Sequence, residues 1–129
     1  MSSNTLGITP FMHVRHCKEA VAFLVERLGF TAIIDDGGYA YLEREGVAIR
    51  ILGHEKDDAP IEGHGGFAYY IDVADVDVVV QQLGPKLAGL PPEHVRGPVD
   101  QDYGQRELII RVPDGNLLVF CQARSRIPA

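Results

Sequence analysis

The chain has 129 residues, which suits a single domain with a buried core. Apolar residues make up 46% of it, and no apolar run approaches the roughly 20 residues of a membrane span, so we expect a cytoplasmic protein outside the membrane. Its 18 acidic and 12 basic residues give a formal charge of −6, which disfavours binding to nucleic acid. The same charge weakly favours a cationic ligand, although moderate acidity more often serves only to keep a protein in solution.

The first half of the chain predicts a strand, a helix and three further strands. Leu6 to Val14 is mostly apolar, and Pro10 within it indicates an edge strand or a crossover point. The stretch CKEAVAFLVERLGF then places its apolar residues on one helical face, with Gly29 at the expected C-cap. Residues 31–53 are typical of three short strands joined by the turns DDGG and EREG.

The second half follows the same order after a polar linker. Phe67 to Val73 predicts a strand, and Asp75 to Leu83 predicts a short helix. Gly84 and Pro85 interrupt this helix, with Lys86 to Leu90 as an alternative continuation. A loop or irregular strand rich in proline follows, and the last two strands are expected at residues 106–112 and 116–122. Both cysteines lie in apolar patterns, so we expect buried free thiols.

The two halves repeat each other. Residues 14–28 match residues 73–87 at an offset of 59, and Gly46 matches Gly115. We therefore predict one α+β domain of two βαβββ modules that pack together, since a module of about sixty residues buries too little core alone. Module 1 spans about residues 6–53, a linker 54–66, module 2 about 67–122 and a tail 123–129.

The stretches VRHCKEAVAFLVERLGF and VPDGNLLVF resemble the glyoxalase/bleomycin resistance protein/dioxygenase family, which has the vicinal oxygen chelate fold. The resemblance covers about residues 7–122. It implies a curved mixed sheet built from the two modules, with the helices outside and a cavity in its concave face. Many members bind a divalent metal there, through residues of the first and last strands of each module.

Carrying the family's metal positions onto this sequence gives no usable ligand set. The first-strand positions fall on Thr9 and Ala68, and the last-strand positions on Val119 and on Arg50, or on Ala48 if the register slips by two. A Mg, Zn, Ni or Fe site needs imidazole or oxygen ligands from several strands. We therefore predict no metal and no other cofactor at this position.

The stretch DYGQRELIIRVPDGNLLVF is similar to the bleomycin-resistance branch of the family. This likeness implies a homodimer that sequesters a large cationic, aromatic antibiotic in grooves at the subunit interface. It also implies an exchange of the first strand between subunits near a proline, for which Pro10 is suitably placed.

Six residues are candidates for ligand binding. By the resemblance, Tyr103, Tyr39 and Tyr70 fall at or near groove aromatics, where they either stack on a ligand or serve as ordinary strand packing. His13 would face the cavity together with Thr9, whereas His16 would face away, and the other histidines are expected in solvent-facing loops. Arg50 either binds an anionic ligand or pairs with Glu107. Alternation places Arg106 and Glu107 on opposite faces of their strand.

Two functions follow as hypotheses. The first is a metal-free binder of an aromatic, cationic compound, with antibiotic resistance as its role. The second is a lyase, isomerase or dioxygenase of the same fold that uses a displaced metal or none, and it would need His13 together with Glu107 or another carboxylate. Nucleophilic catalysis has little support, because the only serines lie near the termini and no G-x-S-x-G or C-x-x-C motif is present.

Overall fold

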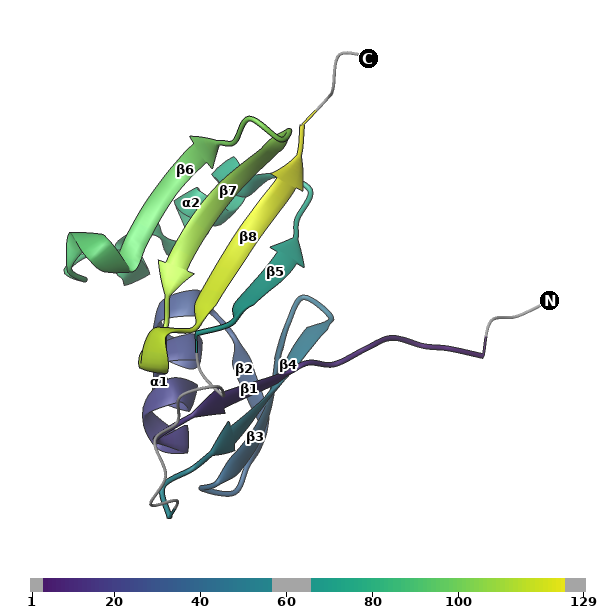
Figure 1. Cartoon of the computed structure of the whole chain (residues 1–129), viewed down its shortest axis with the longest axis vertical. Helices are drawn as coiled ribbons and strands as arrows, with labels where there is room; N and C mark the ends of the chain where they lie inside the picture. The colour runs from purple at the N-terminus through teal and green to yellow at the C-terminus, as the bar shows by residue number, and fades with distance from the viewer. Residues whose placement is uncertain (1–3, 57–65, 125–129) are drawn as a thin grey trace.

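A computed structural model of the chain describes residues 4–56 and 66–124 (Figure 1). Each half of the chain forms one four-stranded mixed sheet, in the orders β1-β4-β3-β2 and β5-β8-β7-β6. The first half contains β1 (Phe11–Val14), α1 (Cys17–Leu28), β2 (Thr31–Asp35), β3 (Tyr39–Arg44) and β4 (Val47–Gly53). The second contains β5 (Ala68–Asp72), α2 (Val76–Leu87), β6 (Val95–Asp100), β7 (Gln105–Arg111) and β8 (Leu117–Ala123), with short 3₁₀ turns at Pro92–His94 and Pro113–Gly115. The predicted fold of two βαβββ modules is confirmed.

The helices follow the predicted repeat. α1 begins at Cys17 and α2 at Val76, an offset of 59, and both helices have 12 residues. The inner faces of the two helices bury residues at equivalent positions. The equivalent pairs are Cys17 with Val76, Ala20 with Val79, Leu24 with Leu83, and Leu28 with Leu87. Each helix covers one face of its sheet, and the buried apolar residues of both modules form a single cluster. The two modules therefore share one core.

Helix α2 is longer than predicted. It runs through Gly84 and Pro85 without a break and ends at Leu87. Proline removes one backbone hydrogen bond from a helix, but Pro85 lies on the exposed side near the C-terminal end. Burial of Leu83 and Leu87 on the opposite side stabilises the last turn and outweighs that loss. The expected interruption at Gly84 and Pro85 is therefore wrong.

Both helices are capped at their N-termini by carboxylates from different sources. In α2 the N-cap residue Asp75 accepts a hydrogen bond from the Asp77 backbone N–H at 2.9 Å. In α1 the N-cap residue His16 makes no side-chain cap, and Glu55 instead accepts from the Cys17 N–H at 3.0 Å. A Cβ at Gly53 would collide with the Glu55 side chain, so the end of β4 requires glycine for this cap.

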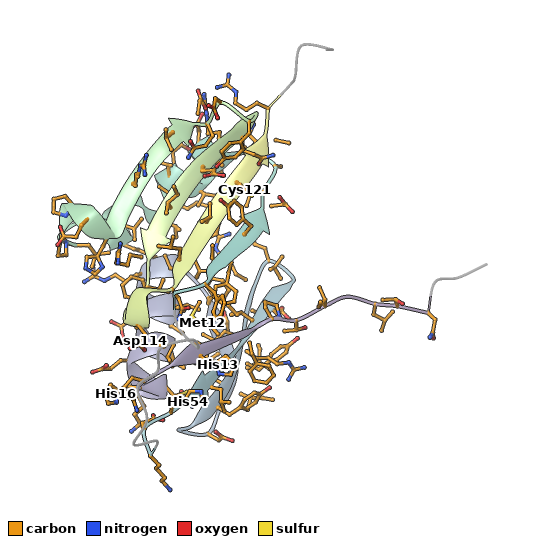
Figure 2. All side chains as sticks on the ribbon, viewed as in Figure 1. Met12, His13, His16, His54, Asp114 and Cys121 are labelled. Atoms are coloured by element: carbon orange, nitrogen blue, oxygen red, sulfur yellow. The ribbon has the colours of Figure 1, made fainter. Side chains whose placement is uncertain are left out.

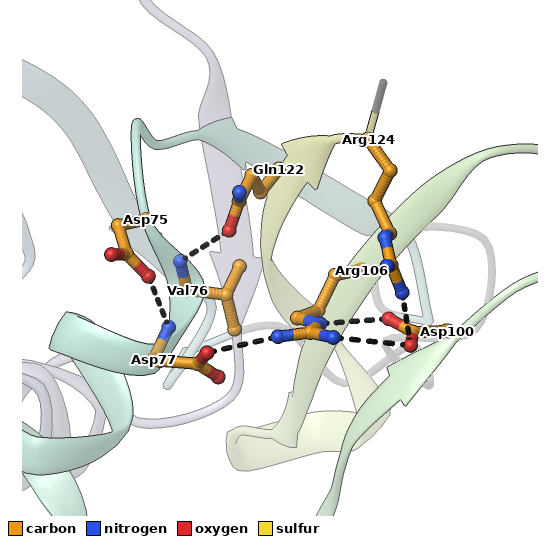
Figure 3. Close-up of polar contacts among 7 residues, drawn as sticks. All are labelled: Asp75, Val76, Asp77, Asp100, Arg106, Gln122 and Arg124. Atoms are coloured by element: carbon orange, nitrogen blue, oxygen red, sulfur yellow. Dashed lines mark hydrogen bonds and ion pairs between the residues drawn. The ribbon is translucent and has the colours of Figure 1, made fainter. Parts of the chain in front are cut away.

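The outer side of the second sheet carries an ion-pair network (Figure 3). The guanidinium of Arg106 binds Asp77 at 2.8 Å and Asp100 at 2.7 Å, and Arg124 also binds Asp100. Hydrogen bonds from Arg106 and Arg124 lower the pKa of Asp100 to about 2. The side chain of Arg106 thus lies on the face of β7 that packs against α2, and Glu107 lies on the opposite face. The alternation of side chains along a strand predicts this arrangement.

Both thiols are buried and free, as expected from the sequence. Burial raises the pKa of Cys17 to about 11, with nearby carboxylates adding to the effect. The pKa of Cys121 is raised to about 12, first by burial and then by its hydrogen bond to Asp72 at 3.3 Å. Within the described part of the chain, no helix is long and apolar enough to cross a membrane.

Candidate functional site

The face of the first sheet that points away from α1 carries aromatic and cationic side chains. The register sets Phe11 of β1 and Tyr41 of β3 on either side of Arg50 in β4. Arg50 lies 4.9 Å from the ring centre of Tyr41 and 5.9 Å from that of Phe11. Its Nη1 donates to the Tyr39 hydroxyl at 2.5 Å. The sheet thereby surrounds one guanidinium with three aromatic rings, a favourable arrangement for a cation.

A pair of histidines lies on the same face (Figure 2). His13 Nδ1 is 2.9 Å from His54 Nε2, and the two ring centres are 5.1 Å apart. One ring must donate its N–H and the other accept it, so the bond requires at least one neutral imidazole. We expected His54 to face solvent, and that prediction is wrong. His54 directly follows β4, which pairs with β1, so its side chain lies beside His13 and is half-buried. His16 is exposed at the N-cap of α1.

The second sheet carries a buried carboxylate. Glu107 is only 1% exposed, and its two oxygens accept hydrogen bonds from Gln101 at 3.1 Å and from the Tyr103 hydroxyl at 2.8 Å. Burial, the hydrogen bond to Glu107 and a further one with Tyr70 raise the pKa of Tyr103 well above its usual value. Tyr70 and Tyr103 nevertheless keep about half of their surface exposed, at 54% and 48%. They form an accessible aromatic pair beside the buried carboxyl group of Glu107.

A cleft of about 850 Å³ lies between the two sheets and the N-terminal arm. The arm, residues 4–10, runs away from the body of the molecule (Figure 1). Tyr41 and Ala48 line the cleft from the first sheet, and Ala68 and Tyr70 line it from the second. Such a volume matches the clefts that bind small organic molecules, which are mostly apolar with a few placed polar groups.

The structure places the family's metal positions as follows. Ala68 begins β5, and Val119 lies in β8 opposite Tyr70. Thr9 precedes β1, and Arg50 takes the place in β4 that the repeat assigned to it. Among residues 4–56 and 66–124, no three His, Cys, Asp or Glu side chains are grouped to hold a metal ion. The donor set at these positions therefore does not fit a metal site of the family type.

The six predicted site residues fall into two groups. His13, Tyr39 and Arg50 lie on the first sheet, while Glu107 with Tyr70 and Tyr103 belongs to the second. The suggested pairing of Arg50 with Glu107 is not formed, because Tyr39 and two rings surround the arginine and Gln101 and Tyr103 occupy the carboxylate.

Sequence reasoning missed four contributors to the site, which are Phe11, Tyr41, His54 and Gln101. Alternation along the strands could have revealed Phe11 and Tyr41, since each lies two residues from a residue already chosen, His13 and Tyr39. No local pattern marks His54 or Gln101. Their roles depend on how a loop returns to the sheet.

Comparisons with known proteins agree with this architecture. A search of curated protein sequences finds no match to the chain. A bleomycin resistance determinant encoded on the transposon Tn5 superposes with a TM-score of 0.74 and 24% identity, covering 94% of this chain and 100% of that one. A bleomycin-binding protein in complex with bleomycin gives 0.72 and 24%, covering 93% and 100%. The bleomycin-binding protein of bleomycin-producing Streptomyces verticillus, in complex with copper(II)-bleomycin, gives 0.69 and 22%, covering 97% and 100%.

At these identities, the likeness to solved structures shows the fold. The family is shown by a match over residues 8–120, nearly the whole chain, to a family model. The repeat of two βαβββ modules and the PDGN turn fit that match. The chain belongs to the Glyoxalase/Bleomycin resistance protein/Dioxygenase superfamily.

Proposed function

We propose that the chain is a metal-free binding protein that sequesters an aromatic, cationic compound in a groove between two copies of itself. The observation that carries the proposal is the buried carboxyl group of Glu107, which accepts a hydrogen bond from the half-exposed Tyr103, itself bonded to the half-exposed Tyr70. Exposed aromatic faces beside an acidic side chain suit a flat ligand that bears a positive charge. The bleomycin-binding proteins among the structural neighbours make such an antibiotic the first compound to test.

A second copy of the chain is the proposed source of the other wall of the groove. In the arm, Leu6 is 98% exposed and Ile8 is 95% exposed, although both line the cleft. Two exposed apolar side chains on an extended segment gain free energy when another surface covers them. Exchange of the arm between two copies near Pro10 would cover them, and antibiotic resistance in the cytoplasm is the role that we propose for the dimer.

Titration of the protein with metal-free bleomycin tests the proposal, with calorimetry and tyrosine fluorescence as readouts. We expect a Kd of about 1 µM or tighter, and a loss of about tenfold in Tyr103→Ala, as removal of a stacking ring predicts. Val78→Ala, on the exposed side of α2, is the control and should bind as the parent does. Absence of any binding at high micromolar bleomycin would refute the antibiotic assignment. A stoichiometric transition metal in protein purified without a His-tag would refute the metal-free assignment.

One observation favours a second function, a lyase, isomerase or dioxygenase of the same fold. The His13 and His54 rings share a hydrogen bond at 2.9 Å on the half-buried face, an arrangement that could move a proton. Glu107 does not join this pair, because its contacts lie with Gln101 and Tyr103. Turnover of a bound compound that disappears in His13→Gln and persists in His16→Gln would support this function over sequestration alone.

A further inference from the structure

Arg50 differs in its partners from Arg44 and Arg106, which are also half-buried. The guanidinium of Arg44 binds Glu45 at 2.6 Å, and that of Arg106 binds Asp77 and Asp100. Arg50 forms no ion pair within residues 4–56 and 66–124, and its guanidinium contacts the Tyr39 hydroxyl and two ring faces. Aromatic faces stabilise a cation but do not neutralise it. This part of the first sheet therefore holds a partly desolvated positive charge.

The guanidinium of Arg50 has N–H groups available to bind an anion. A guanidinium has five N–H donors in one plane, and within the described chain only Nη1 has an acceptor outside the backbone ladder, at Tyr39. The Tyr39 hydroxyl accepts that bond, so its own proton is still able to donate. An arginine edge and a neighbouring hydroxyl together match the oxygens of a carboxylate. The guanidinium carbon lies over the rings of Phe11 and Tyr41, and these contacts restrict its position.

The surroundings also suit the body of an aromatic ligand. Tyr41, whose ring contacts the Arg50 guanidinium, lines the 850 Å³ cleft together with Ala48 and Pro10. Phe11 keeps 43% of its surface exposed beside the same arginine. A ring that lies against these apolar groups would bring an attached oxyanion to Arg50.

We propose that Arg50 and Tyr39 form an anion-binding subsite for an aromatic compound that bears a carboxylate or a related oxyanion. The inference rests on the proposed function for a ligand with an aromatic body, and it adds a charge requirement opposite to that of Glu107. The two sheets then select different ends of a ligand: the first sheet binds an acidic end and the second a basic end. A compound that carries both charges would satisfy both sheets.

The probes for the test are 2-naphthoate, its neutral analogue 2-naphthamide, and 2-naphthyl phosphate, titrated by calorimetry at low salt. We expect naphthoate to bind roughly tenfold tighter than naphthamide, about 1.4 kcal/mol, because only naphthoate can pair with the guanidinium. The preference should shrink as salt is added. Tighter binding of the phosphate than of naphthoate would assign the subsite to phosphate esters, and the reverse order would assign it to carboxylates.

Variants make the assignment specific. Arg50→Gln should abolish the preference for naphthoate over naphthamide, and Arg50→Lys should reduce it, since lysine lacks the planar fork. Arg96→Gln, at an exposed position on β6, is the matched control and should keep the full preference. Tyr39→Phe keeps the ring and removes the hydroxyl, so naphthoate binding should weaken severalfold while naphthamide binding does not change.

Equal affinities for the two probes in the parent protein, or a preference that survives Arg50→Gln, would overturn the subsite. If Arg50→Gln does not fold, the probe ratio in the parent protein and in Tyr39→Phe decides the matter. Failure here is distinguishable from failure of the proposed function, because that test uses a cationic antibiotic and Tyr103 on the other sheet. Bleomycin binding with no naphthoate preference would leave the second sheet's role intact and remove the first sheet's.

Discussion

The side chain of Asn116 in the second module donates a hydrogen bond to the backbone carbonyl of His13 in the first, at 3.1 Å. The same amide accepts from the Phe67 N–H at 3.2 Å, and Asn116 is fully buried. Its neighbour Asp114 accepts from the Arg15 backbone N–H at 2.6 Å (Figure 2). The PDGN turn therefore fastens the junction of β1 and α1 to the other module, close to the paired histidines.

Replacing Asn116 with alanine tests this fastening. The change removes the hydrogen bonds to the His13 carbonyl and from the Phe67 N–H and leaves a gap at a fully buried position, so we expect a loss of about 2–3 kcal/mol in unfolding free energy. Asp114→Ala removes one bond at an exposed position and should cost about 1 kcal/mol or less. Urea unfolding measures both. A cost for Asn116→Ala no greater than that for Asp114→Ala would contradict the fastening role.

Gly84→Ala should stabilise the protein slightly. Gly84 lies inside α2, and apart from its chain neighbours and the backbone of its own helix, a Cβ added there would have no atom within 4 Å. Alanine in place of glycine in a helix gains about 0.5–1 kcal/mol, and contact of the new Cβ with the ring of the following residue, Pro85, offsets part of that gain. Gly97→Ala is the matched control, since Gly97 has a φ of +106° and its Cβ would collide with the Glu107 carbonyl, so that variant should be destabilised. Thermal unfolding distinguishes the two, and a melting temperature for Gly84→Ala as low as that of Gly97→Ala would contradict the prediction.

Alkaline pH should weaken the fold through the two thiols. Their pKa values in the folded protein are raised from 9.0 to about 11 and about 12, so the folded state holds these protons more tightly than the unfolded state. The stabilisation is complete below pH 9 and is lost as the pH rises toward the folded values. Unfolding free energy should therefore fall from about pH 9 to pH 11, by up to about 1.4 kcal/mol per pH unit for each thiol.

The double variant Cys17→Ala with Cys121→Ala separates the thiols from the tyrosines, which also ionise in this range. We expect a lower stability at pH 7 and a shallower dependence on pH above 8.5. Urea unfolding at several pH values measures the slope. A slope equal to that of the parent would show that the thiols do not carry the effect.

Removal of the arm should change the state of association. A chain that begins at Thr9 lacks Leu6 and Ile8, the exposed apolar residues that line the cleft. If a second copy covers them, sedimentation should show a dimer for the full chain and a monomer, or a much weaker dimer, for the shortened one. Ile33→Ser, an exposed position on β2, is the control. A full-length monomer at high micromolar concentration would refute the proposed dimer.

Elements with strong periodicity could be predicted from the sequence. The buried face of α1 follows from the spacing of its apolar residues, and the repeat predicted the start of α2 at an offset of 59. Both hairpin turns equated by the repeat place consecutive residues at positive φ, which are Glu45 with Gly46 and Asp114 with Gly115. The repeat did not reveal the role of Asn116, because its equivalent at the same offset of 69 is Val47, an apolar residue that begins β4.

The candidate site was predicted only in part. The strands set the faces of Tyr39 and Arg50, because side chains alternate along a β-strand. The partner of His13 is 41 residues away in the chain, and the partners of Glu107 come from a loop whose path depends on an irregular strand. Contacts of this kind form only when the tertiary fold brings distant segments of the chain together, and no local sequence pattern marks them. The proline in α2 shows the same limit, since tertiary burial overrides a local preference.

The cap of α1 by Glu55 has a consequence for the order of folding. The helix forms from residues 17–28, but the group that satisfies its first N–H lies 38 residues further along, after β4 has been laid down. Asp114, which binds the Arg15 N–H just before the helix, lies 99 residues away. The N-terminal turn of α1 is therefore completed by non-local contacts, which form late because closing long loops is slow. We expect the amide of Cys17 to gain protection from hydrogen exchange only after β4 has formed, and the amide of Arg15 only after the second module has docked, both later than the amides in the middle of the same helix.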